Sequence, residues 1–296
     1  MTEIICITTY PPRECGIATF SDDLIHAIET KFACSFTIKV CALASSSEQH
    51  IYNDQVKYIL DTSKANEYNN IADRINEDSE VKMVLIQHEF GLYAEHKEAF
   101  LAFVHCIKKP VLIVFHTVLP HPPLTQKKYL IRLIDGCSAV IVMTQTSAGI
   151  LEGDYGIEKE KINIIPHGTH LVSHKDKKKL KAKYNVTGRR ILSTFGLLSP
   201  GKSIETTLEA LPAIIKKNPN VLFLIIGKTH PTIIKQVGET YRNMLQNKII
   251  ELGITHSVRF VNLYLELPIL LEYLQLTDVY LFTSDDPNQA VSGTFV

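Results

Sequence analysis

The sequence predicts an α/β protein of two Rossmann-like domains facing a cleft, with the second domain incomplete. Apolar, β-branched runs alternate with segments of helical period, which is typical of parallel sheets. The alternation pauses at a lysine-rich stretch and then restarts, and each half has a strand–loop–helix unit with a glycine. We therefore expect an N-terminal domain at 1–172, a basic linker at 173–188 and a C-terminal domain at 189–296.

Composition and charge exclude several classes of protein. The 296 residues leave room for about two domains, and 45% of them are hydrophobic. Lys plus Arg (31) equals Asp plus Glu (31), so no overall field favours a nucleic-acid partner. The six cysteines form no C-x-x-C pair, which argues against a zinc site or a disulfide framework. The acidic N-terminus and short apolar runs predict a cytoplasmic chain.

The first half has six or seven strand patterns with helical patterns between them. Strands are expected at 4–9, 37–43, 56–60, 81–87, 111–115, 139–143 and 162–165. Helices are expected from about residue 17 and at 68–76, 99–107, 125–134 and 147–155. This order indicates one parallel sheet covered by helices.

The first strand leads into a loop that carries Arg13 and ends at Gly16, where a helix begins. A glycine there lets a ligand approach the backbone closely. Arg13 is a candidate contact for an anionic or hydroxyl-rich ligand. The alternative is an exposed arginine and a glycine needed only for the turn.

Ionisable residues also follow two central strands. His88 and Glu89 come directly after strand 81–87, and His116 ends strand 111–115. Ligands of parallel sheets bind at the carboxyl ends of the strands, so all three are candidate site residues.

The stretch Lys175–Lys183 contains six lysines with few apolar partners. We interpret it as a linker with a solvated helix. Contact with anionic lipid head groups, as a peripheral membrane surface, is the alternative.

The second half has four strand patterns, at 191–195, 221–227, 258–263 and 278–283, and helical patterns at 204–215, 232–252 and 267–274. Its first strand ends at Gly196, and Lys202 stands at the exit of the following loop. Ser203 is a candidate cap for the next helix. Free N–H groups at a helix start favour an anion, so this loop predicts a phosphate site.

Five segments in order resemble the retaining glycosyltransferases of family 4 (group 1), which have the GT-B fold. They are Cys15–Ala18, Phe115–Thr117, Ile165–Gly168, Phe195–Ser203 and Asp278–Ser284. The resemblance covers essentially the whole chain.

The resemblance implies a nucleotide-sugar donor on the C-terminal domain and an acceptor on the N-terminal one, with no metal and no cofactor. Gly196, Lys202, Ser203 and Gln289 would bind the donor, with Lys202 neutralising its diphosphate. His116 would contact the transferred sugar or support charge at the reacting centre. Gly16 and Arg13 would form a phosphate or acceptor loop, and His88 and Glu89 are candidate acceptor contacts.

Two departures from the family pattern stand out. Leu197 replaces an arginine, and the neutral Gln289 aligns with the first of two glutamates, the second of which would fall past Val296. These departures suggest a truncated, inactive chain.

We expect transfer of a hexose from a GDP- or UDP-linked sugar to a hydroxyl acceptor, either a glycan or lipid-linked. The alternative is a non-catalytic nucleotide-sugar or glycan-binding remnant. An epimerase is a third reading, and a dehydrogenase is disfavoured because neither loop spells G-x-G-x-x-G.

Overall fold

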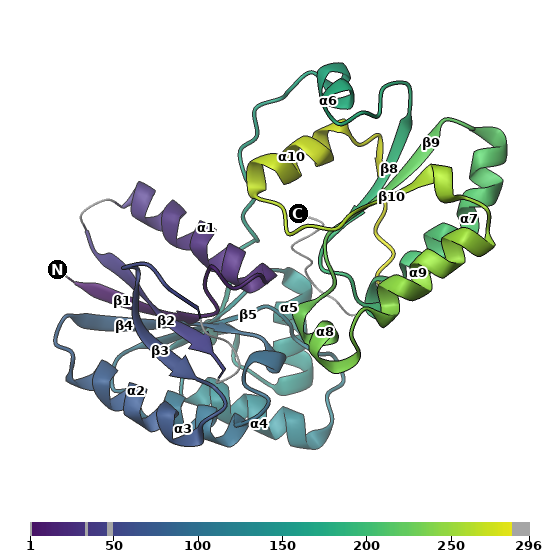
Figure 1. The fold of residues 1–296 in the computed structure, drawn as a ribbon. Coiled ribbons are helices and arrows are strands. Elements are labelled where there is room, and N and C mark those ends of the chain that lie inside the picture. Colours follow the sequence, from purple (N-terminus) through teal and green to yellow (C-terminus); the bar gives the residue numbers. More distant parts are fainter. Residues whose placement is uncertain (1, 33–34, 46–49, 286–296) are drawn as a thin grey trace. The chain divides into compact units, whose positions relative to one another are not determined.

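The computed structural model describes residues 2–32, 35–45 and 50–285, apart from the side chain of Thr232. The described chain divides into two compact units, which meet in sequence between Gly168 and Thr169. Each unit is a parallel sheet covered by helices on both faces, which confirms the α/β fold class (Figure 1).

In the described part of the first unit, the sheet has seven strands in the order β3-β2-β1-β4-β5-β6-β7, all parallel. They are β1 (Glu3–Thr8), β2 (Thr37–Ala44), β3 (Val56–Asp61), β4 (Val81–His88), β5 (Val111–Phe115), β6 (Ala139–Val142) and β7 (Ile162–Ile164). Every strand expected in this half is present.

The helices of this unit are α1 (Gly16–Lys31), α2 (Ala65–Glu77), α3 (Lys97–Cys106), α4 (Leu124–Asp135) and α5 (Gln145–Ile150). Helix α1 covers one face of the sheet, and α2, α3 and α4 cover the other (Figure 1). Helix α5 ends before the expected residue 155, because residues 151–155 form a π-helical turn that stops at Gly156 in a left-handed conformation.

The described sheet of the second unit has four parallel strands in the order β10-β9-β8-β11. They are β8 (Arg190–Phe195), β9 (Val221–Ile226), β10 (Val258–Val261) and β11 (Val279–Tyr280). Helices α7 (Ile204–Lys217) and α9 (Thr240–Glu251) pack on one face, and α6 (Lys177–Lys183) and α10 (Leu267–Leu276) on the other.

Two elements of this unit differ from expectation. Strand β11 has two residues where six were expected, although Leu281 N still donates to Ser193 O. The expected helical region 232–252 is two helices, α8 (Pro231–Val237) and α9, separated by Gly238 with φ +64°. A left-handed residue ends a helix, so the pattern is interrupted there.

The expected linker contains α6, which packs against the second unit. Its Leu180 is buried and lies with Val186, Ile191, Leu222 and Leu276 in one apolar cluster. The helix is therefore held by the packing of Leu180 in this cluster, which the lysine-rich sequence did not predict.

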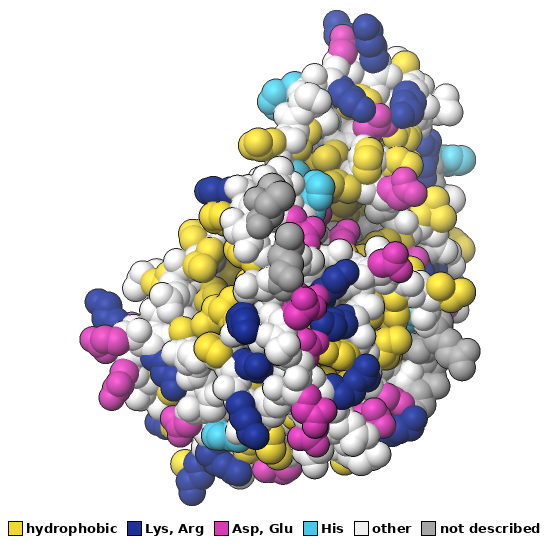
Figure 2. Space-filling view, turned by 90° about the vertical axis from the view of Figure 1, so that its left-hand side faces the viewer, with side chains coloured by type: hydrophobic (Ala, Val, Ile, Leu, Met, Phe, Trp, Pro, Cys, Tyr) yellow, Lys and Arg dark blue, Asp and Glu magenta, His cyan; other side chains and the backbone are white. Residues whose placement is uncertain are grey.

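Two carboxylates pair with four of the six lysines of this segment (Lys175 and Lys183 with Glu272; Lys177 and Lys181 with Asp278). Lys and Arg side chains gather at the upper end of Figure 2, with acidic side chains among them. The pairing leaves less free positive charge for lipid head groups than the sequence suggests. No helix in the described ranges is long and apolar enough to cross a membrane.

Candidate functional site

The loop between β8 and α7 is the first candidate site. Gly196 follows β8 with φ +129°, and its N–H donates to Ile226 O at 3.0 Å. The chain then makes a 3₁₀ turn over Pro200–Lys202 before α7 begins. The structure thus places Gly196, Lys202 and Ser203 in one strand-to-helix loop at the carboxyl edge of the sheet, as expected.

Ser203 does not cap α7 as predicted. Its backbone is left-handed (φ +45°), and its side chain makes no capping hydrogen bond. The hydroxyl of Tyr241 accepts from Ile204 N at 3.1 Å instead, and donates to Glu205 at 2.6 Å. A residue distant in sequence therefore takes the role that local spacing gave to Ser203.

The loop after β9 packs against the β8–α7 loop and is hydrogen-bonded to it. A Cβ atom on Gly227 would lie 2.1 Å from Gly196 O, so the two backbones can approach this closely only because residue 227 is glycine. Leu198 ties the loops together, since it donates to Lys228 O (2.9 Å) and accepts from His230 N (3.0 Å). Gly227 was missed as a site residue, although it ends a predicted strand.

Arg242 is a second residue that the sequence did not reveal. It lies in α9 with 5% of its surface exposed, and its guanidinium donates to Gly227 O at 3.3 Å. The same group stacks over the ring of Phe260. Besides the nearby Glu239 (3.3 Å), its contacts come from other elements of the unit, and no local motif identifies them.

Lys202 is the residue of this loop whose pKa the protein shifts. Its side chain is half-buried, and no carboxylate in the described ranges pairs with its ammonium group. Burial lowers the pKa of Lys202 as a consequence. Thr283 fixes the backbone by donating to Lys202 O at 2.7 Å. A partly desolvated cation that no described carboxylate pairs with gains favourable energy when an anion binds, and a phosphate has this chemistry. Gln289, the fourth expected donor residue, lies outside the described residues.

The second candidate site is at the carboxyl ends of β4 and β5. Nε2 of His116 lies 2.8 Å from Oε1 of Gln87, and Thr117 Oγ1 donates to Glu89 Oε2 at 2.6 Å. Glu89 also accepts from Phe90 N at 2.9 Å. The structure therefore brings His116 and Glu89 to one edge of the sheet and adds Gln87, which sequence reasoning missed.

His116 is a neutral side chain at neutral pH. Burial, and secondly the nearby His167, lower its pKa to about 4. The ring of Phe20 from α1 packs edge-on against His116, with 4.9 Å between centroids, and also contacts His167. A neutral imidazole at this edge can donate one hydrogen bond and accept another, and a hydroxyl group can be the partner of either.

His88 is a core residue, which argues against the expected acceptor contact. It is 1% exposed, and aromatic rings surround it (Phe90, Tyr93, Phe100 and Phe115). Burial lowers its pKa to about 3. Successive strand residues point to opposite faces, so Gln87 meets His116 while His88 faces the helices below the sheet.

The loop after β1 leaves open space at its glycine. Gly16 starts α1, and a Cβ atom there would meet nothing within 4 Å. Cys15 caps the helix through its Sγ atom, which accepts from Ala18 N at 3.4 Å. Arg13 donates to Leu43 O at 3.4 Å, so a backbone carbonyl already holds part of its guanidinium. The ligand roles of Gly16 and Arg13 stay predictions.

One acidic group within the described ranges has metal-like spacing. Carboxylate oxygens of Glu3, Asp78 and Glu80 lie within 4.8 Å of one another. The ammonium group of Lys57 lies 2.5 Å from Glu3 and 2.6 Å from Asp78, so a lysine already occupies the cation position.

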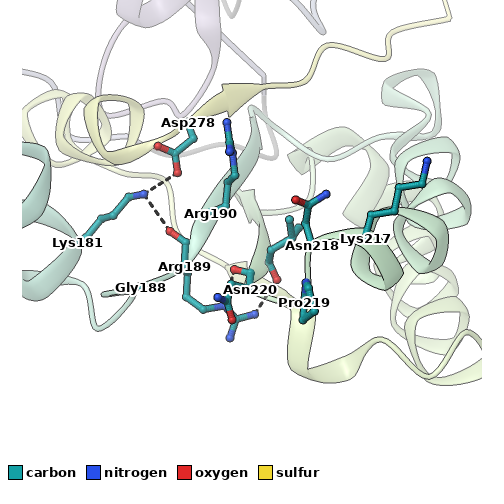
Figure 3. A pocket seen from close by; sticks show the side chains of 10 residues that line it. Lys181, Gly188, Arg189, Arg190, Lys217, Asn218, Pro219, Asn220 and Asp278 are labelled. Atoms are coloured by element: carbon teal, nitrogen blue, oxygen red, sulfur yellow. Dashed lines mark hydrogen bonds and ion pairs between the residues drawn. The ribbon is translucent and has the colours of Figure 1, made fainter.

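A hollow of about 470 Å³ lies at the amino ends of β8 and β9, the opposite edge from Lys202 (Figure 3). Arg189 there donates to the carbonyls of Asn220 (3.1 Å) and Val221 (2.7 Å). Lys181 donates to Arg189 O and pairs with Asp278. These cations hold the backbone, and the sheet geometry places the ligand loop at the other edge.

Solved structures share this fold. HepE of Anabaena in complex with UDP and glucose matches with a TM-score of 0.73 and 16% identity, over 98% of this chain and 76% of that one. Sucrose-phosphate synthase of Thermosynechococcus elongatus matches with 0.72 and 14%, over 96% and 76%. A trehalose-6-phosphate structure from E. coli bound with UDP-2-fluoro glucose matches with 0.67 and 12%, over 96% and 78%. The fold is that of GT-B glycosyltransferases.

A family model matches part of the second unit. Residues 176–290 match the family described as glycosyl transferases group 1. This matched segment contains the whole β8–α7 loop with Lys202. No curated protein matches the chain.

Proposed function

We propose that this protein transfers a hexose from a nucleotide sugar to a hydroxyl acceptor. The observation that carries the proposal is the half-buried ammonium group of Lys202 in the β8–α7 loop, which no carboxylate of the described residues pairs with. A departing nucleoside diphosphate gains negative charge as the glycosidic bond breaks. A fixed cation stabilises that charge more in the transition state than in the ground state, which accelerates the reaction.

UDP is the favoured nucleotide of the donor, and GDP is the alternative. HepE was solved with UDP-glucose and the E. coli protein with UDP-2-fluoro glucose, and both have the fold of this chain. The likeness to family 4 supports retention of configuration. The donor would bind on the second unit, with Gly196 and Ser203 shaping the loop around Lys202.

The first unit would bind the acceptor, a glycan or a lipid-linked hydroxyl compound. His116 would contact the transferred sugar as a neutral hydrogen-bonding group. The open space at Gly16 supports a close approach of ligand to backbone, and Arg13 and Glu89 stand at the same edge of the sheet.

The proposed reaction requires no metal. A membrane contact would depend on Lys178 and Lys179, whose side chains form no salt bridge in the described part of the chain.

Calorimetric titration with UDP and GDP tests the donor site. A charge-assisted hydrogen bond contributes about 1.5–3 kcal/mol, so Lys202→Ala should raise the Kd for the preferred nucleotide roughly 10- to 150-fold. Lys217→Ala is the matched control, because Lys217 lies at the far end of α7 and should leave the Kd unchanged.

Two outcomes would count against the assignment. Equal Kd values for the wild type and Lys202→Ala would remove Lys202 from the donor site, and absence of binding in folded protein would remove the site itself. Release of UDP from UDP-glucose only in the presence of an acceptor would support transfer. Binding without turnover would favour a nucleotide-sugar-binding protein without catalysis.

A further inference from the structure

Gln87 is a fully buried side chain that bonds to His116, the residue expected to contact the transferred sugar. It lies one position before the end of β4, with 0% of its surface exposed. Its Oε1 atom is 2.8 Å from Nε2 of His116, which follows the adjacent strand β5. This contact joins the two strand ends at the edge where the acceptor is expected.

The partner of Nε2 determines how His116 is protonated. A neutral imidazole has one N–H, so one ring nitrogen donates and the other accepts. An amide oxygen only accepts, and His116 Nε2 must then carry the proton. The other nitrogen, Nδ1, keeps its lone pair, and no described residue bonds to it.

The rest of the neighbourhood holds this arrangement in place. His116 N donates to His88 O at 3.0 Å, which fixes the backbone of the histidine. The ring edge packs against Phe20. Cys6 lies near Gln87, and its thiol stays protonated because burial raises its pKa to about 12. The carboxylate of Glu89 at the same edge bonds to Thr117 and Phe90 N, so Gln87 is the side chain that bonds to the His116 ring and can select its tautomer.

The oxygen and nitrogen ends of the Gln87 amide are nearly equal in shape, and the two orientations predict opposite tautomers of His116. With Oε1 toward the ring, Gln87 Nε2 faces the core without an acceptor among the described residues. With the NH₂ group toward the ring, Nδ1 would carry the proton and would donate instead of accept.

We propose that Gln87 is a positioning residue that holds His116 as the neutral Nε2–H tautomer, so that Nδ1 accepts a hydrogen bond from a sugar hydroxyl group. The role of His116 toward the sugar rests on the function proposed above. The tautomer itself does not, because it can be measured in the protein without any substrate.

Histidine side-chain ¹⁵N NMR of the full chain is the first test. The signals of His116 are identified by their loss in His116→Gln. At pH 7 we expect Nε2 to carry the proton and Nδ1 to show the shift of an unprotonated nitrogen. A protonated Nδ1 in the wild type would overturn the proposal without any variant.

Two substitutions then test the role of Gln87. Gln87→Glu places a carboxylate beside Nε2 and should raise the His116 pKa from about 4 by roughly 1–3 pH units. Gln87→Met keeps the volume and removes the amide, so both tautomers should appear. Thr117→Val breaks the neighbouring bond to Glu89 and should leave the His116 signals unchanged.

Kinetics separate this proposal from the proposed function. Both Gln87 variants should lower kcat while leaving the Kd for UDP unchanged, because Lys202 lies in the other unit. Unchanged His116 signals in Gln87→Met would overturn the positioning role even if the protein is an active transferase. Wild-type protein without turnover, but with the expected tautomer, would refute the transferase function and leave the tautomer assignment intact.

Discussion

Lys57 and Lys202 are both partly buried lysines at the edges of parallel sheets, yet their surroundings are opposite. Lys57 lies in β3, and two carboxylates contact its ammonium group (Glu3 and Asp78). Burial disfavours its charge, but the hydrogen bonds to Asp78 and Glu3 outweigh burial and raise its pKa. Lys202 has no carboxylate partner among the described residues; its ammonium group lies over the ring of Phe282 at 5.9 Å, and burial lowers its pKa.

This difference in partners distinguishes a lysine that stabilises the fold from a lysine that can bind a ligand. Lys57 interacts with groups of its own unit, so its interactions contribute to the folding free energy. Lys202 is partly desolvated and meets the ring of Phe282 but no carboxylate of the described residues, so its charge is available to an anionic ligand. Removal of Lys57 should therefore affect stability, and removal of Lys202 should affect binding.

The largest expected effect concerns the loop that holds Lys202 in place. Gly227→Ala would put a Cβ atom 2.1 Å from Gly196 O at a residue with φ +131°. Overpacking and backbone strain together should destabilise the second unit by about 3–5 kcal/mol. Urea unfolding monitored by circular dichroism would measure this loss. Gly201→Ala in the neighbouring β8–α7 loop is the control, because a Cβ there meets nothing within 4 Å; equal stability of the two variants would refute the close packing.

The next effect compares the two lysines directly. Lys57→Met leaves Glu3 and Asp78 close together without a cation, and we expect it to lower the unfolding free energy by about 1–2 kcal/mol, since solvent screens part of the interaction. Lys202→Met removes a partly buried charge that no described carboxylate pairs with, and should leave that free energy unchanged or slightly higher. The same urea series measures both. If Lys202→Met were the less stable variant, the distinction between the lysines would be wrong.

Acid titration sharpens the assignment of Lys57. The hydrogen bond from Lys57 is the largest influence on Asp78, and it lowers the pKa of Asp78 to about 2. A lowered folded-state pKa gives stability that is present above the unfolded value, near pH 4, and is lost as the pH falls toward 2. After allowance for solvent screening, we expect a loss of about 1 kcal/mol over that interval. Unfolding free energies measured from pH 5 to pH 2 should show this slope in the wild type and much less of it in Lys57→Met.

Local sequence signals predicted most of the fold and the loop that carries Lys202. The strand patterns and the glycine followed by Lys202 depend on neighbouring residues, which a sequence displays directly. His88 was misread because the end of β4 still alternates its faces: Gln87 reaches His116, and His88 enters the core. Adjacent residues therefore have different roles.

Contacts between distant residues were not predictable. Tyr241 replaces Ser203 as the cap of α7 across 37 residues, and Gln87 meets His116 across 29. The lysines of 175–183 looked solvated because their partner Glu272 comes from α10, almost a hundred residues later. Tertiary packing decides such pairs, and local propensity carries no information about them.

The smallest expected effect is the pH dependence of nucleotide binding, and it isolates the charge of Lys202. Because burial lowers its pKa, Lys202 should lose its proton at a lower pH than an exposed lysine, whose pKa is about 10.4. Affinity should thus decline a few-fold as the pH rises from 8 to 10. Lys202→Arg keeps its charge throughout this range, so its affinity should decline less. The titration of the nucleotide itself is common to both proteins, and the ratio of their Kd values therefore reports Lys202 alone. A ratio that is constant with pH would mean that the ammonium charge of Lys202 does not contact the diphosphate.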